Sequence, residues 1–203
     1  MLLVKSQYKV AKRLGAGIFE KTQSQKFALS EARTSKKKPR GRGGSDYGRQ
    51  LLEKQKVRFT YGLSERQLSN YAHKAFTEKD PAAALNNSLE TRADSAIYRA
   101  GLASTRRAAR QIVSHGHIVI NGTRITTPSH RVKSGDVITV REGSRTSPLF
   151  ASLSEVNPEV VRSVPKWLDF DVKTLRLEVK SEPTYDSSSV GLDYPTVFEF
   201  YSR

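Results

Sequence analysis

Residues 104–121 constrain the fold more than any other segment, because they combine an amphipathic helix with a tight turn between strands. Ser104 is expected to be the N-cap of the helix, since a serine oxygen accepts hydrogen bonds from the free N–H groups of the first turn. Apolar residues then recur at near-helical spacing, at Ala108, Ala109, Ile112 and Val113. Gly116 suits the left-handed conformation that ends a helix, and Asn121-Gly122 predicts a β-hairpin. The segment therefore predicts a short helix that leads directly into a hairpin.

The same helix carries a group of three arginines. Arg110 follows Arg106 and Arg107 by four and three residues, so the three guanidinium groups are expected to share the face opposite the apolar stripe. Planar, permanently charged groups on a rigid helix suit the recognition of phosphate. This pattern favours RNA binding over catalysis.

The charge of the chain supports a polyanionic partner. The formal net charge is +15 over 203 residues, of which residues 1–90 carry +11, residues 91–142 carry +6 and residues 143–203 carry −2. A charge this large repels itself in a compact state unless a polyanion neutralises it. No run approaches about 18 apolar residues, so no membrane partner is expected. The length allows one sizeable core or two small ones.

The chain offers little material for catalysis or metal binding. It has no cysteine, which excludes disulfides, thiolate zinc sites and thiol nucleophiles. Three of the four histidines lie between residues 115 and 130, but they lack neighbouring carboxylates at a familiar ligand spacing, so no metal site is predicted. We find no phosphate-binding loop or other cofactor motif, and expect no cofactor. The N-terminus lacks a secretory leader, and the cytoplasm is the expected location.

The first 45 residues are expected to form a basic extension. Near its end, residues 36–44 contain five cations, a proline and three glycines, a composition that cannot make a packed core. Two interpretations stay open: a flexible solvated tail, or an arm that becomes ordered between RNA helices.

The remaining chain predicts an α+β fold. From Ser45 the pattern is helical, with a capping box at Ser64 and Gln67 and a further helix that starts at Asp80-Pro81. A small α+β module follows around the helix and hairpin described above. The more apolar tail is expected to pack back on the helical part. The expected domains are residues 1–45, 46–89, 90–153 and 154–203.

Several blocks resemble one protein family along nearly the whole chain. ASTRRAARQIVSHGHIVING, with Gly135-Asp136-Val137-Ile138 further on, is similar to the RNA-binding domain of the small-subunit ribosomal protein S-four family. SDYGRQLLEKQKVRFTYG, LETRADSAIYRAGLAS, PKWLDFD and VFEFYSR resemble its bacterial members. Many of those members carry a four-cysteine zinc site that this chain lacks, so zinc is not implied.

The resemblance implies a structural rRNA-binding protein without enzymatic activity. Family members bind the small-subunit (16S) rRNA early and nucleate assembly of its 5′ domain. They contribute to translational accuracy beside the S-five protein, and with the S-three protein they line the path where mRNA enters. These are therefore the expected partners.

The expected rRNA-binding residues fall into three groups. The extension contributes Lys36, Lys37, Lys38, Arg40 and Arg42. The helical part contributes Tyr47, Arg49, Lys54, Lys56 and Arg58. The α+β module contributes Ser104, Thr105, Arg106, Arg107, Arg110, Gln111, Ser114, His115, His117 and Asn121.

One alternative uses the same α+β module for a different purpose. An rRNA-modifying enzyme also needs to find its RNA, and a fold alone does not fix a function. Such an enzyme requires a separate catalytic domain of ordinary size, whereas only about 60 residues follow the module here. Structural RNA binding is the favoured interpretation.

Overall fold

The chain has the α+β architecture that its sequence predicts, arranged as two compact units. The computed structural model describes residues 4, 6–35, 45–150, 164–186 and 191–203. One unit comprises Met1–Leu85 together with Asp186–Arg203, and the other comprises Asn86–Tyr185. The second unit is thus inserted into the sequence of the first.

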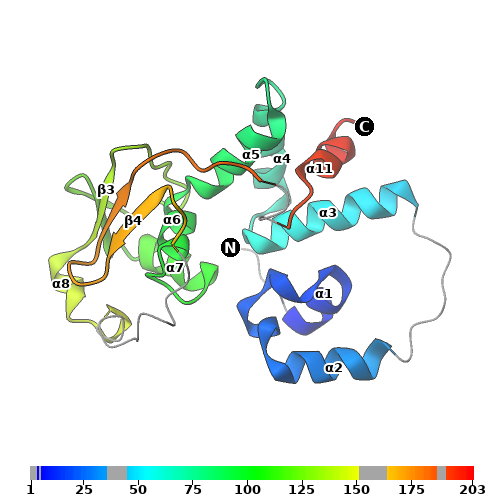
Figure 1. Cartoon of the computed structure of the whole chain (residues 1–203), viewed down its shortest axis with the longest axis horizontal. Helices are drawn as coiled ribbons and strands as arrows, with labels where there is room; N and C mark the ends of the chain where they lie inside the picture. Colours follow the sequence, from blue (N-terminus) through cyan, green and yellow to red (C-terminus); the bar gives the residue numbers. More distant parts are fainter. Residues whose placement is uncertain (1–3, 5, 36–44, 151–163, 187–190) are drawn as a thin grey trace. The chain divides into compact units, whose positions relative to one another are not determined.

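The first unit is helical. It contains α1 (Gln7–Leu14), α2 (Gln25–Ser35), α3 (Asp46–Thr60), α4 (Glu65–Ala75) and α11 (Tyr194–Tyr201) (Figure 1). Helix α5 (Pro81–Glu90) carries the chain into the second unit. The predicted capping box is present at the start of α4, where the Gln67 backbone N–H donates to Ser64 Oγ at 3.2 Å. Helix α5 begins at Pro81, and Asp80 accepts from the Ala83 N–H at 3.1 Å.

Residues 7–35 differ from the expected unpacked extension. Besides α1 and α2 they form two 3₁₀ turns, η1 (Ala16–Ile18) and η2 (Glu20–Gln23). Ala11, Phe19 and Phe27 make a small buried cluster, to which Phe59 of α3 is added at its edge. Widely spaced single apolar residues form this cluster, which is why the segment shows no long apolar run.

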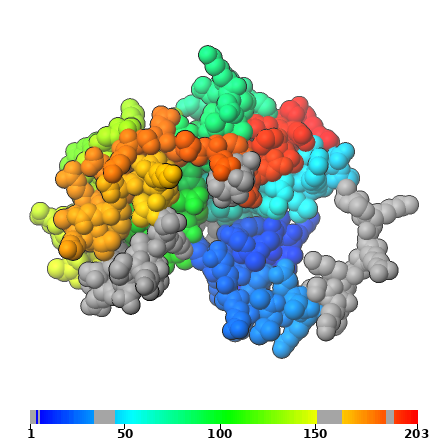
Figure 2. Space-filling model, in the orientation of Figure 1, coloured from blue at the N-terminus to red at the C-terminus, as the bar shows by residue number. Residues whose placement is uncertain are grey.

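Helix α11 packs back on the first unit, as predicted for the C-terminal segment. It contacts α3 and α4, and Figures 1 and 2 show it in red beside the cyan α3. Tyr194 and Val197 are fully buried. The hydroxyls of Tyr194 and Tyr61 lie 3.3 Å apart.

The second unit consists of helices packed on an antiparallel sheet. After α6 (Ala93–Arg99) and α7 (Arg106–Ser114) come β1 (Ile118–Ile120), β2 (Thr123–Ile125), β3 (Val137–Val140) and the short α8 (Glu142–Arg145). Strands β4 (Leu168–Asp171) and β5 (Arg176–Val179) complete the sheet, whose order is β2-β1-β3-β5-β4. The predicted hairpin joins β1 to β2, with Asn121 and Gly122 both at positive φ.

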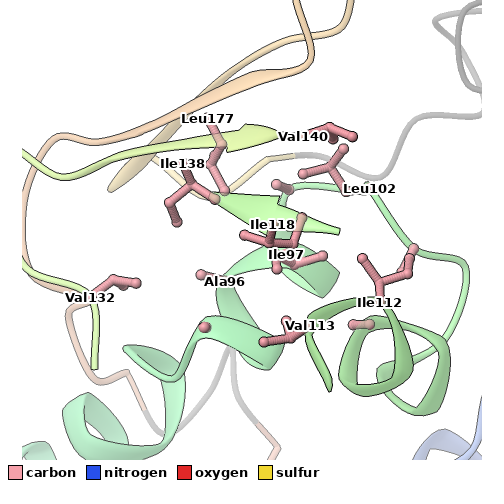
Figure 3. Close-up of a cluster of buried hydrophobic side chains, with 14 of the residues drawn as sticks. Ala96, Ile97, Leu102, Ile112, Val113, Ile118, Val132, Ile138, Val140 and Leu177 are labelled. Carbon is pink, nitrogen blue, oxygen red and sulfur yellow. The ribbon is translucent and has the colours of Figure 1, made fainter. Parts of the chain in front are cut away.

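The core of this unit lies between α6, α7 and the sheet. Figure 3 shows Ile97, Ile112 and Val113 of the helices pointing toward Ile118 and Ile138 of the strands. Burying these side chains contributes roughly 1.5–3 kcal/mol each. The core therefore fixes how α7 is held on the sheet.

The sheet extends further along the chain than the sequence indicated. The tail from residue 154 was expected to return to the helical part, but β4 and β5 belong to the second unit. In the β3–β5 register Ile138 lies opposite Leu177, whose side chain is completely buried. The segment that rejoins the first unit begins at Asp186.

Candidate nucleic-acid interface

Helix α7 is the central element of the predicted interface. Its N-cap is Thr105, whose Oγ1 accepts from the Ala108 N–H at 3.0 Å. The expected cap, Ser104, is wrong by one residue, because the helix begins at Arg106 and the capping oxygen must reach the third N–H of the first turn. The apolar stripe is buried at Ala109, Ile112 and Val113. The opposite side of α7 is left for polar contacts.

Two of the three predicted arginines are held by carboxylates of the protein itself. Arg106 contacts Glu90 at 3.4 Å and Ser95 Oγ at 3.2 Å, and it stacks 4.6 Å from the centre of the Tyr98 ring. Arg110 Nε donates to Asp94 at 2.9 Å. The Arg106 and Arg110 side chains are only 16% and 18% exposed. Both side chains are therefore mostly buried beside α7 and contribute little exposed surface.

Two further arginines complete this network. Arg92 Nε and Nη2 donate to the two oxygens of Asp94 at 2.9 and 2.8 Å, and Arg99 makes a matching pair of 2.8 Å bonds to Glu90. Both carboxylates are 5% exposed. We call Glu90, Arg92, Asp94, Arg99, Arg106 and Arg110 the arginine–carboxylate network. Because its members come from α5, α6 and α7 and from the residue before α6, these ion pairs tie the three helices together.

The remaining polar side chains of α7 form an exposed row. Arg107, Gln111 and Ser114 are exposed and follow one another at helical spacing, and the exposed His115 continues the row past the end of the helix. Within the described residues Arg107 makes no ion pair, in contrast to Arg106 and Arg110. A cation and hydrogen-bonding groups in one line suit contacts with successive phosphates and sugars of a nucleic-acid backbone.

His117 lies at the end of this row in a partly buried position. Its Nδ1 is 2.9 Å from Ser144 Oγ, and its ring packs edge-on against Phe150 at 6.2 Å between centroids. Burial lowers the pKa of His117, and the positive charges of His115, Arg141 and Arg124 lower it further. Both effects favour the neutral form of the imidazole.

Sequence reasoning missed Arg124, which lies beside the same end of α7. Its Nε donates to the Gly116 carbonyl at 3.1 Å and its Nη2 to the His115 carbonyl at 3.2 Å. The φ of +71° at Gly116 favours glycine, and a Cβ there would lie 2.3 Å from the Arg124 Nε and displace the Arg124 side chain from these carbonyls. The turn at Asn121-Gly122 sets the hairpin register, and this register pairs Arg124 with Val119. The turn is therefore the sequence signal from which the position of Arg124 follows.

Asn121 has a structural role in the turn. Its Nδ2 donates to Asp136 at 2.8 Å, and its Oδ1 accepts from the Val137 N–H at 2.9 Å. These bonds tie the β1–β2 hairpin to the start of β3.

The predicted cations of the first unit lie on or near α3, with mixed exposure. Lys54 is buried, with its Nζ 2.8 Å from Glu65 and 4.2 Å from the centre of the Phe200 ring. Lys56 pairs with Glu53, and Arg58 Nε lies 3.8 Å from Glu65. Arg49 and Tyr47 are exposed, although Tyr47 also contacts the Phe200 ring.

The five predicted residues of the basic extension, Lys36, Lys37, Lys38, Arg40 and Arg42, lie outside the described residues. Within the described ranges, no group of three or more His, Asp or Glu side chains is placed to hold a metal ion. The helices described here include none with the length and apolar character needed to cross a membrane.

Comparison with known families divides the chain within a few residues of the first boundary between the structural units. The family described as ribosomal protein S4/S9 N-terminal domain matches residues 3–90, and the S4 domain family matches residues 91–138. The second match covers α6, α7, β1 and β2 and ends within β3. It therefore contains the arginines of α7.

Curated relatives match over most of their length. The small ribosomal subunit protein uS4 of Roseiflexus castenholzii is 40% identical over 200 residues, which cover 96% of each chain. The protein of the same name from Lachnospira eligens is 41% identical over 83% of this chain and 85% of its own. That of Clostridioides difficile is 43% identical over 78% and 76%. With both of its units matched in order, the chain belongs to the small ribosomal subunit protein uS4 family.

Proposed function

We propose that this chain is a structural, non-enzymatic constituent of the small ribosomal subunit that binds the small-subunit rRNA. The observation that carries the proposal is the exposed row of α7, which lies over the arginine–carboxylate network. The network fixes α7 in place, while the row presents groups that reach phosphate and sugar oxygens. The names of the curated relatives support the same role.

The predicted contact residues divide into two kinds under this proposal. Arg107, Gln111, Ser114 and His115 meet the RNA directly. Arg106 and Arg110 hold α7 in position through their ion pairs with Glu90 and Asp94, and the small exposed part of each guanidinium group faces the phosphates. In the first unit the exposed Arg49 and Tyr47 are better placed for direct contact than the buried Lys54.

The finer roles follow from the resemblance of the whole chain to this family. We infer that the protein joins the 16S rRNA early, nucleates assembly of the 5′ domain, and contributes to accuracy and to the path where mRNA enters. The S-five and S-three proteins are the proposed neighbours, at the cytoplasmic ribosome.

A binding experiment with two RNAs tests the main proposal. The full chain is titrated with a transcript of the 5′ domain of small-subunit rRNA and with an unrelated transcript of equal length, over a range of salt concentrations. We expect tighter binding to the rRNA transcript and a linear fall of log K with log salt, with a slope of roughly −0.7 to −0.9 per phosphate contact. Equal affinity for both transcripts would contradict the proposal.

The variant Arg107→Ala tests the exposed row. Loss of one phosphate contact should weaken rRNA binding roughly five- to eightfold in 0.1 M salt, the factor that this slope gives. The unfolding free energy should change by no more than about 0.5 kcal/mol, because the side chain is exposed. Arg176→Ala on β5 is the control, since it also removes an exposed arginine, from another element of the same unit.

A further inference from the structure

Cationic and titratable side chains from several elements gather beside the C-terminal end of α7. His115 and His117 lie with ring centroids 6.0 Å apart, and Arg124 donates to the His115 carbonyl. Arg141 follows β3, and its backbone N–H donates to the His117 carbonyl at 2.8 Å. We call His115, His117, Arg124 and Arg141 the α7-end cluster.

The guanidinium of Arg124 is fixed in place by the backbone. Carbonyl groups at the end of a helix carry partial negative charge, so the two bonds to His115 and Gly116 suit a cation. They use two of its five N–H donors, and the other three have no protein acceptor in the part of the chain described. Because the geometry is set before any ligand binds, these donors require little further ordering.

The charges around His117 come almost entirely from cations. His115 on α7, Arg124 on β2 and Arg141 after β3 all act on its imidazole, while α8 adds the exposed Glu142 and Arg145 next to Ser144. Burial of the ring lowers the pKa of His117 first, and the three cations lower it further. An anion held among these groups would reverse the effect of the cations.

We propose that the α7-end cluster is a phosphate-binding site for the RNA backbone, continuous with the exposed row of α7. The inference rests on the proposed rRNA binding and assigns it a second contact. Ser114 and His115 link the row to the cluster without a break, which favours the same RNA strand over an acidic protein segment as the ligand. Arg124 and Arg141 become binding residues that the helix pattern alone did not indicate.

The test uses the full chain and the rRNA 5′-domain transcript. Arg141→Ala is the cleaner variant, because within the described residues the Arg141 side chain makes no hydrogen bond or ion pair. Arg124→Ala is the second variant, with its fold checked by circular dichroism, and Arg176→Ala is the control. Each cluster variant should weaken binding roughly five- to eightfold in 0.1 M salt and make the salt slope shallower by roughly 0.7–0.9.

A second readout follows the protonation of His117 directly. The chain has four histidines, so its imidazole signals can be followed by NMR, and a His117→Gln variant identifies the His117 signal. Binding of the transcript should raise the pKa of His117, because a phosphate stabilises the protonated ring. An unchanged or lowered pKa would overturn the proposal.

The outcomes separate this inference from the proposed function. If the wild type prefers the rRNA transcript but both cluster variants bind like Arg176→Ala, the phosphate site is refuted and rRNA binding stands. If the wild type binds both transcripts equally and the cluster variants still weaken binding, the phosphate site stands and the proposed rRNA role is refuted.

Discussion

Neighbouring arginines of α7 have different surroundings although they share one helix. Arg106 and Arg110 contact the carboxylates of Glu90 and Asp94, whereas Arg107 is exposed. A carboxylate that is 5% exposed is stable in its charged form only when cations and hydrogen bonds surround it. Removing either partner of such a pair would leave the other charge buried and uncompensated, which lowers the free energy of unfolding.

The variant Asp94→Asn tests this dependence. It removes the negative charge that Arg92 and Arg110 share, so we expect the unfolding free energy to fall by about 3 kcal/mol, the lower end for breaking a buried ion pair. Denaturant unfolding monitored on the second unit measures the change. Asp169→Asn is the control, because its ion pair with Lys180 is more than half exposed and should be worth less than about 1 kcal/mol. Equal losses in the two variants would show that burial of the pair is not the cause.

Helical spacing correctly placed three arginines on α7, but the expectation that their guanidinium groups share one face is wrong: Arg106 and Arg110 turn to buried carboxylates, whereas Arg107 is exposed. Glu90 and Asp94 precede Arg106 and Arg110 by 16 residues in each case, and no local pattern links positions so far apart. Only tertiary packing brings Glu90 of α5 and Asp94 of α6 to the arginines of α7. Residue type and period therefore predicted the location of the surface, and tertiary contacts decided which side chains remain exposed.

At the scale of elements, α11 is held to α3 and α4 by polar as well as apolar contacts. Tyr201 donates to Glu65 at 2.9 Å, and Lys54 reaches the same carboxylate from α3. Burial raises the pKa of Glu65, but the hydrogen bonds from Lys54 and Tyr201 and the nearby charges of Lys54 and Arg58 outweigh it and lower the pKa below its ordinary value of 4.5. Burial and the Glu65 bond raise the pKa of Tyr201.

A pH dependence of stability follows from the lowered pKa of Glu65. A carboxyl whose pKa is lower in the folded state contributes fully above its unfolded pKa, and that contribution is lost as the pH falls below about 4.5. We therefore expect the stability difference between the wild type and Glu65→Gln to be largest near pH 7 and to shrink on acidification. Urea unfolding of the first unit at pH 7 and at pH 4 measures it. Glu78→Gln, at an exposed carboxyl, should show no such trend.

Elements with strong local signals were predicted well. The capping residues of α3, α4 and α5 and the Asn121-Gly122 turn are present as expected. Helices α1 and α2 were missed because their small core depends on Phe19 and Phe27, which are too far apart to make a periodic pattern. The place of β5 beside β3 was missed because strand pairing across more than 35 residues leaves no local trace.

At the scale of the whole molecule, the first unit is built from both ends of the described chain. Tyr194 and Val197 of α11 are fully buried against helices that precede the second unit. A chain shortened to end at Tyr185 should therefore lose protection of the α3 amides from hydrogen exchange, while the amides of β1 and β3 keep theirs. Exchange measured on both chains by mass spectrometry checks this, and unchanged protection of α3 would contradict it.

This connectivity also sets an order of events during synthesis. A ribosome makes α3 and α4 early, but the helix that covers them is translated only after the whole second unit. The sheet and α7 are thus complete in sequence while the earlier helices still lack their partner. Although the N-terminal part of a chain generally folds first as it is made, here the unit that contains the N-terminal helices is the last to be completed.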